Sequence, residues 1–253
     1  MNNSLTIHNL YVVLASSKEE KQVLHGIDLI VPSGQLHVVM GPNGAGKTTL
    51  ALSLMGHPNY KLSPPAGGSE FRIDGKDMIG LKPEERAKAG LFVSFQQPVE
   101  ITGVSVLAFL RTAYKALHPE EKIPLSDFKN TVKEALIAVE LGEQFMQRSV
   151  NEGFSGGEKK RLEIVQLLIL KPKFAILDEI DSGLDIDSLK IIAKILGVAA
   201  KKYNMGILLI THYQRILHLL HPDAVHVLVN GKIKRSGGTE LVEQIEKEGY
   251  ATI

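Results

Sequence analysis

A glycine-rich run early in the chain has the residue types and spacing that bind phosphate. The run Gly41-Pro42-Asn43-Gly44-Ala45-Gly46-Lys47-Thr48 fits the pattern G-x-x-x-x-G-K-[ST], and Thr49 follows it. In this pattern backbone N–H groups wrap the phosphates, the lysine reaches the β- and γ-phosphates, and the hydroxyl binds Mg²⁺. A strand-like apolar run precedes the motif and a helical pattern follows it, as the chemistry requires. The sequence therefore predicts a nucleotide phosphate site.

Two adjacent acids close a later apolar run, Phe174–Leu177. The carboxyl end of a parallel strand is where α/β sheets bind nucleotides. We expect Asp178 to bind Mg²⁺, and Glu179 to orient or deprotonate the attacking water. The alternative is that the acids only cap the next turn, and the phosphate-binding pattern in the same chain makes that the weaker interpretation.

A second helix start also has the character of an anion site. The turn Ser155-Gly156-Gly157-Glu158 comes directly before an apolar helical pattern. Ser-x-x-Glu is a capping box, so a well-capped helix is the simpler interpretation. Two adjacent glycines, however, destabilise a first turn by roughly 1 kcal/mol each unless close backbone approach is needed. A phosphate at the helix N-terminus would supply that need.

Two more polar residues follow predicted strands. Gln96 could contact Mg²⁺ or the attacking water, and His212 could donate a hydrogen bond to the γ-phosphate. Taken alone, a loop glutamine is usually solvated and a lone histidine is more often structural. Four histidines lie close together in the sequence without the carboxylates or cysteines that would complete a zinc site: His212, His218, His221 and His226. The run Lys159-Lys160-Arg161 predicts a solvated helix face.

The composition limits the possible functions. Of 253 residues 44% are hydrophobic and 23% are charged, which suits one α/β domain with an insert or two small domains. A net charge of +1 gives no field that favours nucleic acid or an anionic membrane. The absence of cysteine excludes disulfides and thiolate-held clusters within the chain. No apolar run is long enough to span a bilayer, and the first strand pattern starts near Leu5, so we expect a cytoplasmic protein without direct membrane insertion.

Strand and helix patterns alternate on both sides of a helical stretch. Strands are predicted at 5–12, 22–31, 36–40, 70–73, 91–95, 174–177 and 207–210, with a hairpin at 225–235. Helices are predicted at 47–55, from the Ser-Gly-Gly-Glu turn to 170, at 186–201 and after 239, and a surface loop at 56–68. Between 98 and 152 apolar residues recur at helical spacing with no strand pattern. We therefore expect an α/β core at 1–97 and 153–253 with a helical insert at 98–152.

The order of these motifs resembles that of the ABC-type ATPases along the whole chain. Residues 41–49 resemble the phosphate loop of that family, Gln96 its Q-loop, Ser155–Glu158 its signature, Asp178-Glu179 its acidic strand end, Asp185 its D-loop and His212 its switch histidine. The resemblance implies a P-loop core with a mixed sheet, an N-terminal antiparallel β portion and an inserted α-helical subdomain.

The same resemblance implies how the site would work. Two ATP molecules would be sandwiched between two copies of the chain, which associate head to tail and transiently when ATP is bound. Each signature turn would face the γ-phosphate bound by the other copy. Mg²⁺ would be held through Thr48, Gln96 and Asp178, and Glu179, His212 and Gln96 would be the catalytic residues.

Several stretches are more specifically similar to the SufC group, the ATPase subunits of the SUF iron–sulfur cluster assembly machinery. These stretches are 95–101, 103–105, 153–161, 181–187, 211–217 and 248–250. The similarity implies SufB and SufD scaffold proteins as partners, in which ATP hydrolysis would drive conformational change. A chain without cysteine could drive cluster assembly but could not hold a cluster by thiolates.

Two other functions are weighed against this one. The first is the ATPase subunit of a membrane transporter, which has the same chemistry and a different partner. The second is a non-catalytic nucleotide-binding module, against which the presence of Lys47, Asp178, Glu179 and His212 argues.

The sequence also departs from the family patterns at a few positions. Thr102 stands where the SufC group often has proline, and Leu162 where it often has asparagine. Leu14 stands where many ABC ATPases stack an aromatic ring on the adenine, with Tyr11 nearby. Glu158 replaces the glutamine of many transporter subunits. By analogy with the family, we expect the scaffold to dock in a groove between 96–101 and the helical insert.

Overall fold

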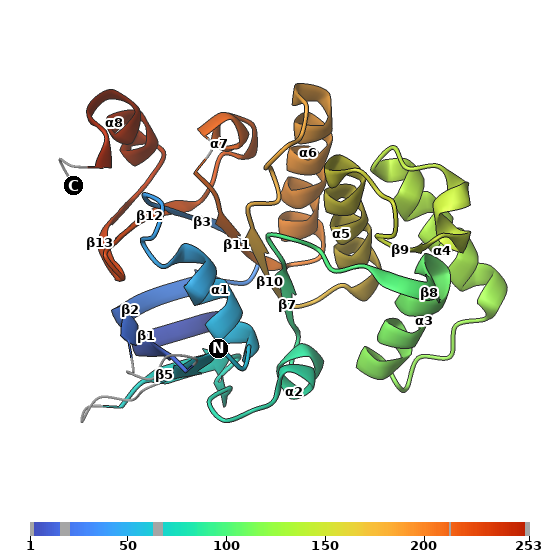
Figure 1. The fold of residues 1–253 in the computed structure, drawn as a ribbon, viewed down its shortest axis with the longest axis horizontal. Coiled ribbons are helices and arrows are strands. Elements are labelled where there is room, and N and C mark those ends of the chain that lie inside the picture. The colour runs from blue at the N-terminus through green and yellow to red at the C-terminus, as the bar shows by residue number, and fades with distance from the viewer. Residues whose placement is uncertain (1–2, 16–20, 63–67, 213, 251–253) are drawn as a thin grey trace.

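A computed structural model describes residues 3–15, 21–62, 68–212 and 214–250 of the chain. Tyr213, in one of the SufC-like stretches, and residues 63–67 of the expected surface loop lie outside the described residues. Two sheets lie side by side, and a layer of helices covers the far face of the larger one (Figure 1).

The larger sheet positions most of the predicted site residues. Its strands are β3 (Leu36–Met40), β7 (Leu91–Ser94), β10 (Phe174–Asp178), β11 (Gly206–Ile210), β12 (Ala224–Val229) and β13 (Lys232–Gly237), in the order β13-β12-β3-β11-β10-β7. Every neighbouring pair is parallel except β12 and β13. All residues of β3, β10 and β11 are buried, because both faces of the sheet are covered. The carboxyl ends of these three adjacent strands therefore meet at one edge.

The smaller sheet is antiparallel and comes from the first part of the chain. Strands β1 (Ser4–Leu14), β2 (Lys21–Pro32), β5 (Glu70–Ile73) and β6 (Lys76–Asp77) follow the order β2-β1-β5-β6. A further strand, β4 (Tyr60–Leu62), pairs with β1 inside the segment expected to be a loop. Its three residues are too few to show an alternating pattern, which is why the sequence did not predict it.

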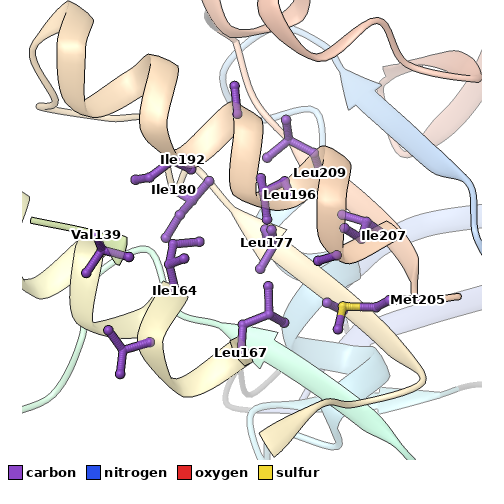
Figure 2. Packing of buried hydrophobic residues seen from close by; sticks show 14 of the residues in the cluster. Val139, Ile164, Leu167, Leu177, Ile180, Ile192, Leu196, Met205, Ile207 and Leu209 are labelled. Atoms are coloured by element: carbon purple, nitrogen blue, oxygen red, sulfur yellow. The ribbon is translucent and has the colours of Figure 1, made fainter. Parts of the chain in front are cut away.

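The core is divided by the larger sheet into two clusters. Helix α1 (Lys47–Met55) packs between the two sheets, and α2 (Pro83–Lys88) follows β6. On the other face lie α5 (Gly156–Leu170), α6 (Ile186–Lys202), α7 (Gln214–Leu220) and α8 (Glu240–Glu248). Figure 2 shows Ile164 and Leu167 of α5 facing Leu177 of β10, beside Ile192 and Leu196 of α6. These apolar contacts fix α5 against the strand that carries the two acids.

The expected helical insert contains α3 (Val106–Leu117), α4 (Leu125–Ala138) and a 3-10 turn at Glu143–Gln147. The expectation that no strand interrupts it is wrong, because β8 (Ile101–Ser105) and β9 (Ser149–Val150) form a small antiparallel ladder. The ladder pairs Ile101 with Val150 and Ser105 with Ser149, with an irregularity between the two pairs. Strands this short and irregular leave no period-two pattern in the sequence. Among all the described helices, none combines the length and apolarity needed to cross a membrane.

Candidate nucleotide-binding site

The phosphate-binding pattern lies between β3 and α1. Gly44 and Gly46 have φ values of 79° and 105°, which L side chains rarely adopt. A Cβ at Gly41 would lie only 2.1 Å from the carbonyl oxygen of Leu228, so no larger residue fits there. No side chain among the described residues caps the N-terminus of α1. The N–H groups of its first turn are therefore available to an anion.

Lys47 lies folded over this loop. Its Nζ donates to the carbonyl oxygens of Gly41 at 2.8 Å and Pro42 at 3.0 Å. Burial lowers the pKa of Lys47, and the nearby carboxylates of Glu179 and Asp178 oppose that effect. The ammonium group is thus held at the loop, between backbone oxygens and acids, where a phosphate could replace the carbonyl contacts.

Glu179 is the centre of a three-residue cluster drawn from three neighbouring strands. Gln96, after β7, donates from Nε2 to Oε2 of Glu179 at 2.7 Å. Nδ1 of His212, after β11, lies 3.2 Å from Oε1, and because a carboxylate oxygen only accepts, the proton of that bond sits on Nδ1. The structure therefore brings together all three residues that the sequence nominated for catalysis.

The backbone of Glu179 is itself unusual. Its φ is 50°, a left-handed conformation that costs a non-glycine residue about 1 kcal/mol. Its N–H donates to the carbonyl of Ile210 at 2.8 Å, and the Ser182 hydroxyl donates to its carbonyl at 2.9 Å. These bonds hold the strained residue in place, so the direction of its carboxylate is set by neighbouring elements.

Asp178 is buried in a way that suits a cation. The residue is 1% exposed, and neither carboxylate oxygen has a well-formed hydrogen bond among the described residues. Burial raises the pKa of Asp178, while the nearby Thr48 hydroxyl lowers it. The buried carboxylate of Asp178, the Thr48 hydroxyl that interacts with it and the amide oxygen of Gln96 are hard oxygen donors, which Mg²⁺ prefers. The residues present therefore fit this ion.

Most of these groups line one cavity of about 470 Å³, a size typical of small-ligand sites, and Asp178 is not among the described lining residues. Its lining residues are Val23, Asn43, Gly44, Gly46, Lys47, Thr48, Thr49, Gln96, Glu179 and His212. Val23 was not predicted from the sequence. Leu14 and Tyr11, nominated near the adenine, are not among the described lining residues, and their role stays a prediction.

The Ser-Gly-Gly-Glu turn begins α5 as a reciprocal capping box. The Ser155 N–H donates to Oε2 of Glu158 at 2.7 Å, and the Glu158 N–H donates to Oγ of Ser155 at 3.3 Å. None of the four residues is among the described residues that line the cavity. Neither Gly156 nor Gly157 has a positive φ. A Cβ at Gly156 would meet open space, and one at Gly157 would lie an ordinary 3.5 Å from Leu184. The packing of this chain alone gives no reason for the two glycines.

Asp185, predicted as a D-loop residue, has a local role in the structure. It is the N-cap of α6, and its Oδ1 accepts the Ser188 N–H at 2.8 Å. This backbone bond lowers the pKa of Asp185. The residue is exposed, so any role toward a second copy stays a prediction.

The expectation that residues 159–161 form a solvated face is wrong for Lys160, which is 4% exposed. Its Nζ donates to the carbonyl oxygens of Phe95 and Gln96, both at 3.0 Å. Glu163, one turn later, accepts the Phe95 N–H at 2.9 Å. The helical period could have revealed this, because Lys160 precedes Ile164 by four residues and so falls on the apolar face of α5.

The four histidines that lie close together in the sequence do not gather at one place: His218 and His221 line one cavity, while His212 contacts Glu179 and His226 contacts His37. His226 contacts Nδ1 of His37 in β3 at 3.0 Å and the Ser236 hydroxyl at 2.8 Å, while His218 pairs with Glu246. Within the part of the chain that the structure describes, no three metal-binding side chains gather as a metal site would require.

Comparison with known proteins gives concordant results. A family model described as ABC transporter matches residues 24–182. Vegetative protein 296 of Bacillus subtilis (strain 168) is 46% identical over 249 residues, which cover 98% of this chain and 92% of that protein. The probable ATP-dependent transporter ycf16 of Cyanophora paradoxa is 47% identical over 240 residues, covering 94% of this chain and 91% of the other.

A solved structure confirms the fold expected from the sequence. It is the dimeric post-hydrolysis state of the ATP-binding cassette MJ0796 bound to ADP and Pi, with a TM-score of 0.79 and 20% identity. The match covers 92% of this chain and 98% of that one. The shared architecture is an α/β fold with a mixed sheet and an antiparallel sheet from the first part of the chain.

Proposed function

Because the chain belongs to the ABC transporter family and is an ATPase that binds ATP and Mg²⁺, we propose a task for that ATP hydrolysis. It drives conformational change in a scaffold complex that assembles iron–sulfur clusters. The scaffold would consist of SufB and SufD proteins. The hydrolytic part of the proposal is carried by one observation, the convergence of Gln96 and His212 on Glu179 next to Lys47.

The geometry supports a division of labour among these residues. The loop at 41–49 would bind the phosphates through backbone N–H groups, with Lys47 exchanging its carbonyl contacts for the β- and γ-phosphates. Asp178, Thr48 and Gln96 would hold Mg²⁺, which when bound supplies positive charge to the leaving phosphates. Glu179 would accept a proton from the attacking water, and His212 would donate to the γ-phosphate.

The contacts of Glu179 also support slow turnover by the isolated chain. Both of its carboxylate oxygens are hydrogen-bonded within the chain, one to Gln96 and one to His212. Each oxygen can still accept a second hydrogen bond from water, but the bonds to Gln96 and His212 limit the directions from which water can approach. Closure driven by a partner would change these contacts, so we expect the scaffold to raise the rate.

The signature turn supports a site shared by two copies. Gly156 and Gly157 adopt conformations open to any residue, and no atom of the described residues lies within 4 Å of where a Cβ of Gly156 would stand. Glycine there costs helix stability, which is accounted for if a phosphate held by another copy approaches the backbone of residues 155–158. Two such contacts would form when two copies associate head to tail around two ATP molecules.

The SUF assignment has support from the sequence stretches at 95–101, 103–105 and 153–161, which are similar to the SufC group. The name of one relative, the probable ATP-dependent transporter ycf16, favours a second candidate, the ATPase subunit of a membrane transporter. The two functions share their chemistry and differ in the partner, so identifying the partner decides between them.

A pull-down from the native source would identify that partner. A tagged chain should capture soluble SufB- and SufD-type scaffold proteins, and capture of an integral membrane protein instead would establish the transporter function. Val99, which is 69% exposed beside the Q-loop, offers a specific variant. Val99→Ser should weaken capture, whereas Ile30→Ser on β2, which removes a 56% exposed side chain outside the helical insert, should leave it unchanged.

A further inference from the structure

Helix α5 carries two buried charges just beyond the signature turn. Lys160 and Glu163 stand three residues apart on one face, and their side chains are each 5% exposed. Their charged atoms lie 3.6 Å apart, too far for a hydrogen bond but close enough for an ion pair. Burying two charges is costly unless other polar groups complete the arrangement. The groups that complete it belong to the Q-loop.

The two side chains hold the backbone of two consecutive residues. Nζ of Lys160 donates to the carbonyl oxygens of Phe95 and Gln96, each at 3.0 Å. Oε1 of Glu163 accepts the N–H of Phe95 at 2.9 Å. Bonds with an ionised partner are stronger than neutral ones, and these are shielded from water. One helix thus holds Phe95 and Gln96 by three backbone groups.

Gln96, whose backbone carbonyl is held by Lys160, is also the residue whose side chain contacts Glu179. The side chain of Gln96 donates to Glu179 at 2.7 Å, and its reach depends on where its own backbone sits. At its other end, α5 begins at Gly156, and its N-cap Ser155 forms the capping box with Glu158. The Lys160–Glu163 pair therefore links the Q-loop to the helix that presents the signature turn.

We propose that Lys160 and Glu163 are positioning residues that fix the backbone of Gln96 relative to Glu179 and couple the Q-loop to the signature helix. The inference rests on the proposed role of Gln96 at the catalytic site. Neither side chain needs to touch nucleotide, and each acts through the loop it holds. A displacement of the Q-loop, such as partner docking would cause, would be transmitted to the turn at 155–158.

Steady-state ATP hydrolysis by the full chain tests the proposal. Lys160→Met should lower kcat about tenfold and change the KM for ATP by less than about twofold, because a misplaced catalytic group affects the chemical step more than ground-state binding. Lys160→Arg keeps donors for both carbonyls and should recover kcat to within about threefold. Lys133→Met, which removes a partly exposed lysine from α4, is the control and should retain wild-type kcat. An unchanged kcat in Lys160→Met would overturn the proposal.

A second variant covers the case in which Lys160→Met does not fold, because it leaves Glu163 buried and unpaired. The double variant Lys160→Met/Glu163→Leu removes both charges and restores an apolar contact. It should unfold at a temperature close to that of the wild type and still show the low kcat. A folded double variant with normal kcat would overturn the proposal.

Combining Lys160→Met with Gln96→Ala tests the catalytic role of Gln96 separately from its positioning by Lys160. If Lys160 acts through Gln96, then Gln96→Ala/Lys160→Met should have the same kcat as Gln96→Ala alone. Independent, multiplying losses would overturn positioning through Gln96. If Gln96→Ala itself retains full kcat, the proposed role of Gln96 fails. If Gln96→Ala is slow while Lys160→Met is normal, only the positioning inference fails.

Discussion

Nε2 of Gln96 donates a hydrogen bond of 2.7 Å to Oε2 of Glu179, although 83 positions separate the two residues in the chain. The contact follows from the sheet. Strands β7 and β10 are parallel neighbours with Ser94 opposite Leu177, so the residues after their carboxyl ends emerge together. Strand β11 lies on the other side of β10, with Ile210 opposite Asp178, and brings His212 to the same acid. Three adjacent strands thus deliver the three residues proposed for catalysis.

Substitution of the central acid should separate nucleotide binding from hydrolysis. Glu179→Gln keeps the size of the side chain and can still pair with Gln96, but it cannot accept a proton from water. We expect ATP binding to be retained and hydrolysis to slow by about 100-fold or more, as is typical when a general base is lost. Glu84→Gln, an exposed site on α2, is the matched control. Turnover at the wild-type rate in Glu179→Gln would exclude Glu179 as the base.

Removal of the Lys47 side chain should weaken the binding of ATP. Lys47 is held by Gly41 and Pro42 in this structure and would exchange those bonds for phosphate oxygens. A hydrogen bond to a charged group contributes about 1.5–3 kcal/mol, so Lys47→Ala should weaken ATP binding by about 10- to 100-fold. Titration calorimetry with Lys129→Ala, an exposed lysine on α4, as control measures this. Equal affinities in the two variants would contradict the phosphate-loop assignment.

The signature turn offers a variant that should improve the isolated chain while disabling the shared site. In Gly156→Asp the new side chain meets open space, and an acid in the first turn of a helix is favoured by the helix dipole. The melting temperature should therefore stay the same or rise. The added negative charge would repel a phosphate held by another copy, so dimer formation with ATP should be lost in sedimentation. A Gly156→Asp chain that still dimerises with ATP would show that this turn does not face the nucleotide.

The buried histidine pair should make stability depend on pH. Burial, with a smaller contribution from His37, lowers the pKa of His226 to about 4 from an ordinary value near 6.5. Between these values the unfolded chain binds a proton that the folded chain does not. The free energy of unfolding should therefore fall as the pH drops from about 6.5 to about 4, by up to about 3 kcal/mol from this residue.

Two buried acids change in the opposite direction, which makes a variant necessary to isolate the histidine. Burial raises the pKa of Glu163 to about 7 and of Asp181 to about 6, so their contributions to stability are present at low pH and are lost as the pH rises through those values. Denaturant titrations at several pH values should show a flatter acid side for His226→Gln than for wild type. His8→Gln removes an exposed histidine as the control. Parallel curves for wild type and His226→Gln would contradict the assignment.

Local patterns predicted most of the elements because the strongest signals in this chain are local. The fully buried, mostly apolar strands β3, β10 and β11 and the glycine-rich run beside them are visible in any short window of the sequence. Strands β4, β8 and β9 were missed because pairing of a few residues with a distant strand leaves no periodicity behind. Short, partner-dependent strands of this kind become visible only with the sheet register in hand.

The site was predictable as a set of residues but not as an arrangement. Gln96, Glu179 and His212 were nominated by their positions after strands, yet the contacts between them depend on strand order, which no single segment encodes. Lys160 was misread because a charged run usually faces water, and here its stem lies on the apolar stripe of α5 with backbone carbonyls as partners. The glycines of the signature turn have no steric reason among the described residues, because a Cβ at Gly156 would have no neighbour there within 4 Å, and their contact with a phosphate stays a prediction.

The shared site is the central claim, and mixing two inactive variants tests it most directly. Glu179→Gln keeps an intact signature turn, and Gly156→Asp keeps an intact Glu179. A head-to-tail dimer of one copy of each variant contains one complete site. That site combines Glu179 of the Gly156→Asp copy with the unaltered signature turn of the Glu179→Gln copy. The account predicts that an equimolar mixture hydrolyses ATP faster than either variant alone at the same total concentration. A mixture no more active than the average of its parts, with ATP still bound by Glu179→Gln, would contradict the claim that residues 155–158 complete the site of another copy.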